Sequence, residues 1–163
     1  MTAKLPDAAG RHAEAEDLVQ LRALVFRWVT DGWHLERGET FDFRRLLESY
    51  YDWDSADVLL HDNADPDRAL CRSAASYAAL WDRALTTLVA LDNNVIDGPH
   101  VAMSGDLAVA DVCFRSRFEF DNGDVDVVPT RSSLALRRKG NRWVIFREHG
   151  SALSPERESR EQV

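Results

Sequence analysis

Two neighbouring residues near the end of this chain, Glu148 and His149, carry side chains well suited to acid–base chemistry. A carboxylate can act as a general base, and an imidazole exchanges a proton near neutral pH. Both residues follow the apolar segment Trp143–Phe146, whose composition is typical of a β-strand. Because side chains alternate across a strand, the two groups must point to opposite faces of a sheet.

The strands that position these groups are predicted by a change of period at Thr87, after which apolar and polar residues alternate. Strands are expected at about residues 88–96, 99–104, 107–120, 125–138 and 143–151, with turns at 97–99 and 104–106. Asn122-Gly123 and Gly140-Asn141 predict two-residue hairpin loops, because both positions tolerate positive φ.

The N-terminal half predicts three helices. Leu18, Leu21, Val25 and Trp28 recur at helical spacing, which indicates a helix from Glu14 to about Glu36. Further helices are expected over 43–51, capped by Asp42, and after the cap Ser73, with a short strand over 58–61 between them. Three helices before a meander indicate an α+β domain in which the helices cover the apolar face of the sheet.

The two hairpin loops predict which side chains share a face. With two-residue loops, Phe114 lies opposite Arg131, and Ser133 lies opposite Glu148. The nearly uniform apolar face is expected to be concave and covered by helices; it carries Ala108, Ala110, Val112, Phe114, Phe118, Phe120, Val125, Val127, Ala135, Val144 and Phe146, with Arg131 and Glu148. The mixed face, which carries Leu107, Val109, Asp111, Cys113, Leu136, Trp143, Ile145 and His149, suits an outer dimer interface. A one-residue bulge would exchange the faces.

Two alternative acid–base sites follow from these faces. In the first, Arg131 binds a carboxylate or enolate oxygen of a ligand and Glu148 is the base or the orienting partner, unless the two form a structural ion pair. In the second, with the faces exchanged, His149 and Asp111 form the acid–base pair inside the pocket. On the first assignment His149 is instead a hydrogen-bonded interface residue.

Three segments resemble the SnoaL-like family of the nuclear-transport-factor-2-like superfamily, which includes ketosteroid-isomerase-like proteins. They are Leu46–Val58, Ser104–Ala110, and Arg131–Leu136 with the closing blocks Gly140–Ile145 and Glu148–Ser151. The resemblance spans about residues 14–152. It implies a cone-shaped α+β roll, with three N-terminal helices packed on a curved antiparallel β-sheet, an internal pocket and a homodimer. The superfamily contains isomerases, cyclases, dehydratases and non-catalytic association domains, so it defines the fold better than the activity. The Tyr/Asp/Asp set of classical ketosteroid isomerases has no convincing counterpart here.

Several aromatic and polar residues fall on elements that border the pocket mouth in that fold. Tyr51, Trp53, His61 and Trp81 are the candidate substrate-binding residues. Aromatic walls with a few polar groups are typical of sites for small apolar ligands. The alternative is that these side chains simply pack in the core.

Composition narrows the remaining possibilities. The chain has 163 residues, 45% hydrophobic content and a net charge of −8, with scattered basic residues, which fits one acidic domain and not a nucleic-acid-binding protein. No segment is apolar and long enough for a membrane span or a signal peptide, so a cytoplasmic location is expected. Cys71 and Cys113 are expected to be reduced thiols. We expect a flexible N-terminal arm at 1–11, the domain at 12–153 and a polar tail at 154–163.

The sequence therefore predicts a small-molecule pocket protein. Our first hypothesis is that the protein is a cofactor-independent isomerase, cyclase or dehydratase that acts on a small hydrophobic carbonyl compound. The alternatives are a non-catalytic ligand-binding domain and a dimerisation domain. No phosphate-binding loop, dinucleotide fingerprint, nucleophile elbow or zinc spacing occurs in the sequence, so neither a cofactor nor a metal is expected.

Overall fold

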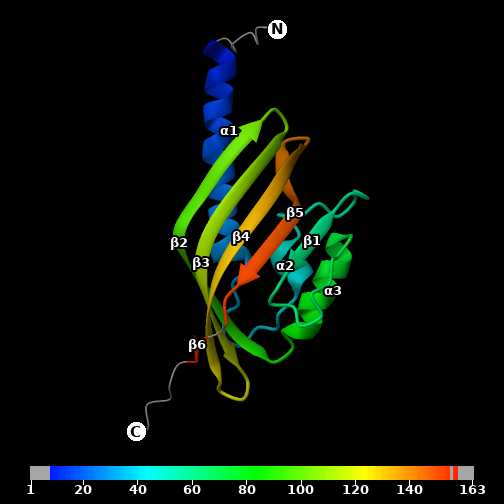
Figure 1. Cartoon of the computed structure of the whole chain (residues 1–163), viewed down its shortest axis with the longest axis vertical. Coiled ribbons are helices and arrows are strands. Elements are labelled where there is room, and N and C mark those ends of the chain that lie inside the picture. The colour runs from blue at the N-terminus through cyan, green and yellow to red at the C-terminus, as the bar shows by residue number, and fades with distance from the viewer. Residues whose placement is uncertain (1–7, 155, 158–163) are drawn as a thin grey trace.

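The computed structural model describes residues 8–154 and 156–157 and has the α+β architecture that the sequence predicts (Figure 1). Its elements are α1 (Ala8–Arg27), a π-helical turn (Trp28–Gly32), α2 (Phe43–Leu47), β1 (Leu59–Asp62), α3 (Ala74–Ala84), β2 (Leu88–Ser104), β3 (Leu107–Phe120), β4 (Val125–Lys139), β5 (Arg142–Ala152) and β6 (Glu156–Arg157). The sheet order is β1-β5-β4-β3-β2, and β6 pairs with β4.

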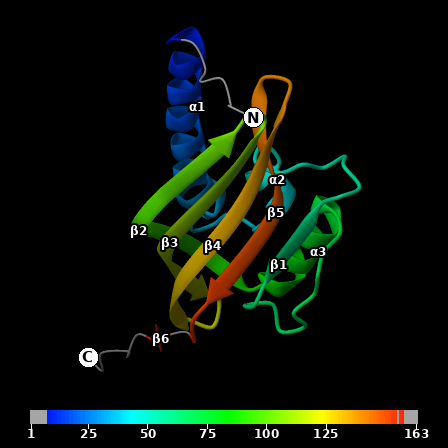
Figure 2. The same ribbon diagram turned by 45° about the horizontal axis from the view of Figure 1, so that its top comes forward.

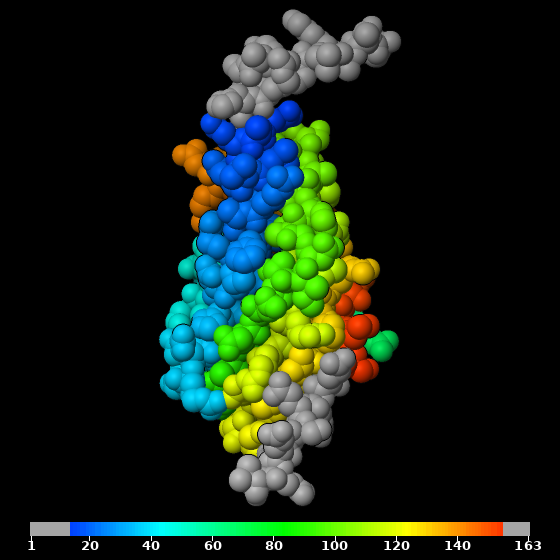
Figure 3. Space-filling view, turned by 90° about the vertical axis from the view of Figure 1, so that its left-hand side faces the viewer, coloured from blue at the N-terminus to red at the C-terminus, as the bar shows by residue number. Residues whose placement is uncertain are grey.

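The sheet is strongly curved, and helices pack on one side of it (Figures 1 and 2). Long α1 runs beside β2, as the space-filling view in Figure 3 shows, whereas α2 and α3 lie on the β1 side of the molecule. All neighbouring strands are antiparallel except β1, which pairs in parallel with β5. The sheet is therefore mixed, not purely antiparallel as expected.

Local capping signals place the two shorter helices. Asp42 accepts a hydrogen bond from the Arg45 N–H at the start of α2, and Ser73 accepts one from the Ser76 N–H at the start of α3. Both predicted caps are thus confirmed. Helix α2 ends at Leu47, earlier than predicted, and α1 begins at Ala8, earlier than the predicted Glu14. Residues 1–7 of the expected N-terminal arm lie outside the described residues, as does most of the expected tail after Ser154.

Strand β2 is continuous where the sequence predicted two strands and a turn. Its pairing with β3 shifts register between Leu88 and Ala90, between Val95 and Asp97, and between Asp97 and His100. Extra residues of this kind are β-bulges, which bend a strand without ending it. The predicted turn at 97–99 is therefore a bulge, and it contributes to the curvature of the sheet.

The β3–β4 connection has one residue more than predicted. Phe120 N–H donates to the Asp124 carbonyl, which leaves a three-residue loop closed by Gly123 at φ +83°. The extra residue moves every pair along β3–β4 by one, so Phe114 lies opposite Thr130 and not Arg131. Ser132, Leu134 and Leu136 consequently face the core, and Ala135 does not. The Gly140-Asn141 loop has two residues, as predicted.

Strand β5 contains a second one-residue change, a bulge at Phe146. Leu136 pairs with Ile145, but Ala135 pairs with Arg147, so Phe146 is the extra residue. Trp143 and Ile145 are buried in the core before the bulge, and Glu148 is buried after it. The predicted outer position of Trp143 and Ile145 is wrong, as is the inner position of Phe146. Glu148 points inward as expected, but only because two changes cancel. The extra residue in the β3–β4 loop and the bulge at Phe146 each reverse the face of the residues that follow.

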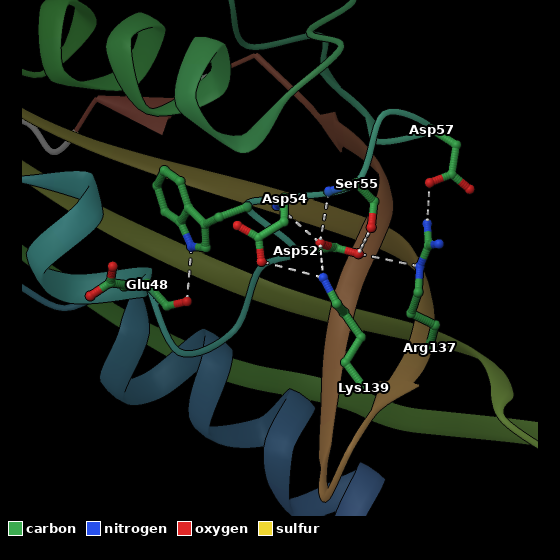
Figure 4. A network of polar contacts seen from close by, with 8 residues as sticks. Glu48, Asp52, Asp54, Ser55, Asp57, Arg137 and Lys139 are labelled. Atoms are coloured by element: carbon green, nitrogen blue, oxygen red, sulfur yellow. Dashed lines mark hydrogen bonds and ion pairs between the residues drawn. The ribbon is translucent and has the colours of Figure 1, made fainter.

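A buried carboxylate fixes the segment after α2 to the β4–β5 hairpin (Figure 4). Asp52 is 1% exposed; it accepts a hydrogen bond from Lys139 Nζ at 2.8 Å and one from Ser55 Oγ at 2.8 Å, and it lies 3.4 Å from Arg137 Nε. Although burial acts to raise it, these hydrogen bonds hold the pKa of Asp52 at about 2.

We expect Asp52→Asn to cost about 2–3 kcal/mol of unfolding free energy in urea titrations at pH 7, because buried charge-assisted hydrogen bonds are lost. Asp54→Asn is the matched control: its side chain is 88% exposed, 3.5 Å from Lys139, and should matter little. A lowered pKa stabilises the fold only above the unfolded value of 3.8, so the difference should shrink as pH falls from about 4 towards 2. Equal effects of the two variants would contradict this role.

Among the described residues, no helix has the length and hydropathy needed to cross a membrane.

Candidate functional site

The concave side of the sheet and the covering helices enclose a cavity of about 490 Å³. The aromatic side chains of its wall are Trp28, Trp33, Trp81, Phe114, Phe118 and Phe120. Polar groups enter this wall from each of the strands β1 to β5; they include Asp62, Asn93, Ser116, Asp126, Ser132 and Glu148. An apolar cavity with a few convergent polar groups is the usual form of a small-molecule site.

Glu148 is held by two tyrosines from separate parts of the chain. Its side chain is 6% exposed, Tyr51 Oη donates to Glu148 Oε2 at 2.6 Å, and Tyr77 Oη donates to Oε1 at 3.1 Å. Trp28 Nε1 donates in turn to Tyr51 Oη at 3.1 Å. Both carboxyl oxygens therefore have a partner, and the orientation of the carboxyl group is fixed.

Backbone pairing and ring packing position these tyrosines. The Ile145 N–H donates to the Tyr50 carbonyl at 2.7 Å, and the Asp52 N–H donates to the Ile145 carbonyl at 2.9 Å, so Tyr51 is held against β5. Tyr77 lies on the inner face of α3. The Phe43 ring packs between them, with centroids 5.2 Å from Tyr51 and 5.6 Å from Tyr77.

Burial dominates the acid–base properties of this group. Desolvation, together with repulsion from Asp62, raises the pKa of Glu148 to about 8, although the tyrosine hydrogen bonds act in the opposite direction. Burial and the Glu148 charge likewise raise the pKa of Tyr51 and of Tyr77 well above 10. Glu148 is therefore largely protonated at neutral pH, and the tyrosines remain hydrogen-bond donors.

Asp62 adds a second carboxyl group to the cavity. It lies on β1 opposite Gly150 of β5, and a Cβ atom at Gly150 would overlap its carboxyl group. The absence of that side chain lets Asp62 lie across β5, close to Glu148. Burial raises the pKa of Asp62, while the N–H of Ala64, which donates to Oδ1 at 2.7 Å, acts to lower it.

The structure separates the first predicted pair. Arg131 lies opposite Cys113 on the outer face and is exposed, so the predicted pairing of Arg131 with Glu148 is wrong. The physical reason is the three-residue β3–β4 loop, which turns Arg131 outward. Its expected role as a ligand contact inside the pocket has no geometric basis.

The second predicted pair lies on the outer face as well. Asp111 is exposed and accepts a hydrogen bond from Ser133 Oγ at 2.5 Å, and Ser133 pairs with His149. His149 is exposed, and its ring lies 5.1 Å from that of His61 on β1. Asp111, His149 and His61 therefore form a row outside the sheet, away from the cavity.

Of the aromatic candidates, only Trp81 lines the cavity directly. Tyr51 acts on Glu148 from behind the wall. Trp53 lies outside: its Nε1 donates to the Glu48 carbonyl at 2.9 Å, and the Arg44 guanidinium lies 4.7 Å from its ring. Trp53 and His61 are thus not placed to contact a ligand in this cavity.

Sequence reasoning did not identify Tyr77 or Trp28 as site residues, and it placed Asp62 only near the pocket mouth, beside His61. A tyrosine within an apolar helix stripe was one available signal, since a buried hydroxyl needs a partner. Gly150, two residues after Glu148, was another, since a strand glycine often marks a close approach. Within residues 8–154 and 156–157, no three His, Cys, Asp or Glu side chains are grouped so that they could hold a metal ion.

A curved mixed sheet with helices on its concave side, around a cavity with a buried carboxyl group, defines a nuclear-transport-factor-2-like fold. No family model matches the sequence, and no curated protein resembles it significantly in sequence. The likeness is found among solved structures. They include a protein of this superfamily from Salmonella enterica, with 16% identity and a TM-score of 0.66, covering 88% of this chain and 95% of that one.

Two other solved structures show what kinds of protein share the fold. A hexachlorocyclohexane dehydrochlorinase has 8% identity and a TM-score of 0.64, covering 96% of this chain and 97% of its own. The association domain of a Caenorhabditis elegans calcium/calmodulin-dependent kinase has 16% identity and a TM-score of 0.54, covering 86% and 96%. At such identities the likeness establishes the fold alone.

Proposed function

We propose that this protein is a cofactor-independent enzyme that uses Glu148 to move a proton on a small hydrophobic carbonyl compound. The observation that carries the proposal is one buried carboxyl group in the wall of an aromatic cavity, oriented by two tyrosines, with a pKa of about 8. A group that titrates near neutral pH can both accept and return a proton.

The proposed step is proton abstraction next to a carbonyl. The C–H bond breaks, the proton passes to a Glu148 oxygen, and the electron pair moves to the carbonyl oxygen as an enolate. If a carbon–carbon double bond is conjugated to the enolate, return of that proton to the γ-carbon re-forms the carbonyl and completes an isomerisation. If the substrate has a β-hydroxyl, the carbonyl re-forms, a carbon–carbon double bond forms as the C–O bond breaks, and the proton leaves with the hydroxyl as water, which completes a dehydration. An apolar substrate in the cavity would displace water, which would strengthen the electrostatic interactions there.

The comparisons support this proposal at the level of the fold. A dehydrochlorinase named for a small apolar substrate shares the architecture, so the same cone is compatible with enzymes on such molecules. The association domain of the kinase shares the fold but is named for assembly and not for a reaction. Non-catalytic ligand binding is therefore the alternative, and the isotope-exchange test distinguishes it from catalysis.

The test is isotope exchange. Wild type, Glu148→Gln and the exposed-site control Glu14→Gln are incubated in D₂O with a panel of small cyclic ketones, and loss of the α-proton is followed by NMR. We expect Glu14→Gln to match wild type and Glu148→Gln to exchange at least ~100-fold more slowly, since general acid–base groups contribute about 10²–10⁴-fold. Exchange that is unaffected in Glu148→Gln contradicts the proposal. A thermal shift with a ketone but no exchange assigns the cavity to non-catalytic binding.

Tyr51 is proposed as a positioning residue, and the pH profile tests it. Wild-type kcat/KM for exchange should rise with pH through about 8, because the carboxylate is the base. Tyr51→Phe removes a donor to that carboxylate and should move the midpoint to higher pH. Tyr50→Phe, a half-buried neighbour without this contact, is the control. A lower rate in Tyr51→Phe with an unmoved midpoint indicates a merely structural role.

We also propose that the outer sheet face forms a homodimer contact, as the sequence suggested. An apolar groove there is lined by Ala102, Met103, Leu107, Val109, Ala135 and Phe146, and Leu107 and Val109 are more than half exposed. A Val109→Asp variant should sediment as a monomer at concentrations where wild type is a dimer, because a charge would be buried in an apolar contact. A wild-type monomer at micromolar concentration refutes this contact.

A further inference from the structure

The Asp62 and Glu148 carboxyl groups face a cavity whose described wall contains no cationic side chain. Asp62 and Glu148 enter from adjacent strands on the same side of the sheet, and no Lys, Arg or His of residues 14–154 is among the lining side chains. The charged and titratable neighbours His61, Arg147 and His149 point to the other face, although the two histidines still act to lower the pKa of Asp62. Buried acidic groups ordinarily have a counter-charge or a ligand.

One carboxyl oxygen is available to a ligand. Asp62 is 9% exposed, and its Oδ1 accepts the Ala64 N–H, whereas no described residue donates to its Oδ2. The Oδ2 atom lies over Gly150, in the space that a side chain at that position would fill. The tyrosines occupy both Glu148 oxygens, so Asp62 is the better direct contact and Glu148 the adjacent one.

The rest of the wall suits the same chemistry. Trp28, Trp33 and Trp81 line the cavity together with Phe114 and Phe118 of β3, and the Trp28 and Phe114 rings pack edge to face at 6.2 Å. The faces of aromatic rings attract organic cations, and the attraction is stronger when the cation is desolvated. Aromatic walls beside the Asp62 carboxyl group are thus complementary to a cation with an apolar body.

We propose that the ligand of this cavity is a hydrophobic amine whose ammonium group pairs with Asp62 beside Glu148. This inference deepens the proposed function by adding an ammonium group to the carbonyl substrate, which would make it a hydrophobic amino-carbonyl compound, and it rests on that proposal only in using the same cavity. A bound ammonium group would also favour the ionised form of Glu148 by lowering its pKa. The carboxylate that abstracts the proton would then form when the ligand binds.

The test compares three probes of one shape: 4-phenylbutylamine, 4-phenylbutanol and 4-phenylbutanoate. Binding is measured by quenching of the cavity tryptophans and by calorimetry at pH 7 in two buffers with different ionisation enthalpies. We expect the amine to bind at least ~10-fold more tightly than the alcohol, the carboxylate to bind most weakly, and amine binding to release protons from Glu148. An alcohol as tight as the amine, or a tighter carboxylate, overturns the proposal.

Variants separate this inference from the proposed catalysis. Asp62→Asn should remove the preference for the amine while leaving the affinity for the alcohol unchanged, and Asp67→Asn, an exposed position in the same loop, should behave as wild type. Glu148→Gln should retain the amine preference through Asp62 but release no protons. If the protein does not exchange the α-protons of ketones but still binds the amine more tightly than the alcohol, only the catalytic proposal is refuted. If Asp62→Asn keeps the preference, the amine proposal falls whatever the exchange assay shows.

Discussion

Glu148→Gln is expected to flatten the dependence of stability on pH. The unfolded carboxyl group has a pKa near 4.5 and the folded one a pKa of about 8, so the folded state binds the extra proton between these values. Stability therefore falls as pH rises through this window, by up to about 1.4 kcal/mol per pH unit and roughly 4–5 kcal/mol in total. Urea unfolding at half-unit steps from pH 4 to pH 9 measures this loss.

Three variants test whether Glu148 causes this pH dependence of the unfolding free energy. Glu148→Gln should lose most of the slope between pH 5 and 8, because the amide does not ionise, whereas Glu14→Gln should run parallel to wild type. A smaller residual slope in the same direction is expected from Asp62, whose pKa is also raised by burial, and it should disappear in the Glu148→Gln, Asp62→Asn double variant. Parallel curves for wild type and Glu148→Gln would show that the carboxyl group is already ionised in the native state at pH 5.

Gly150→Ala is expected to destabilise the protein by about 2–3 kcal/mol at pH 7. The added methyl group would overlap the Asp62 carboxyl group, and overpacking of a buried site costs of this order. Gly150 is an ordinary extended strand residue, so the cost arises from the contact and not from backbone strain. Ser151→Ala, an exposed change on the same strand, is the control and should cost under about 0.5 kcal/mol.

A double-mutant cycle distinguishes this contact from a general intolerance of β5. In an Asp62→Ala background, Gly150→Ala should cost less than about 0.5 kcal/mol, which gives a coupling of about 2 kcal/mol between the two positions. The single Gly150→Ala variant should also lose the amine preference, because Asp62 is displaced. Additive effects in the cycle would mean that the overlap does not determine the requirement for glycine.

Local signals predicted much of the architecture. The caps Asp42 and Ser73, the Gly140-Asn141 loop and the alternation along β3 each depend on neighbouring residues, and each is confirmed. The parallel pairing of β1 with β5 was not predicted, because it joins residues nearly ninety positions apart. The same holds for Tyr51 and Tyr77, which reach Glu148 from different elements.

The sequence by itself determined that Glu148 and His149 must face opposite ways and that one of them belongs to a pocket. The tertiary structure decided which one, through two single-residue changes, the three-residue loop before β4 and the bulge at Phe146. Each change reverses the face of every residue beyond it, and each is selected by packing of the whole sheet against the helices. For the same reason only the folded chain could bring Asp62 over Gly150 and beside Glu148, where the proposed amine would bind.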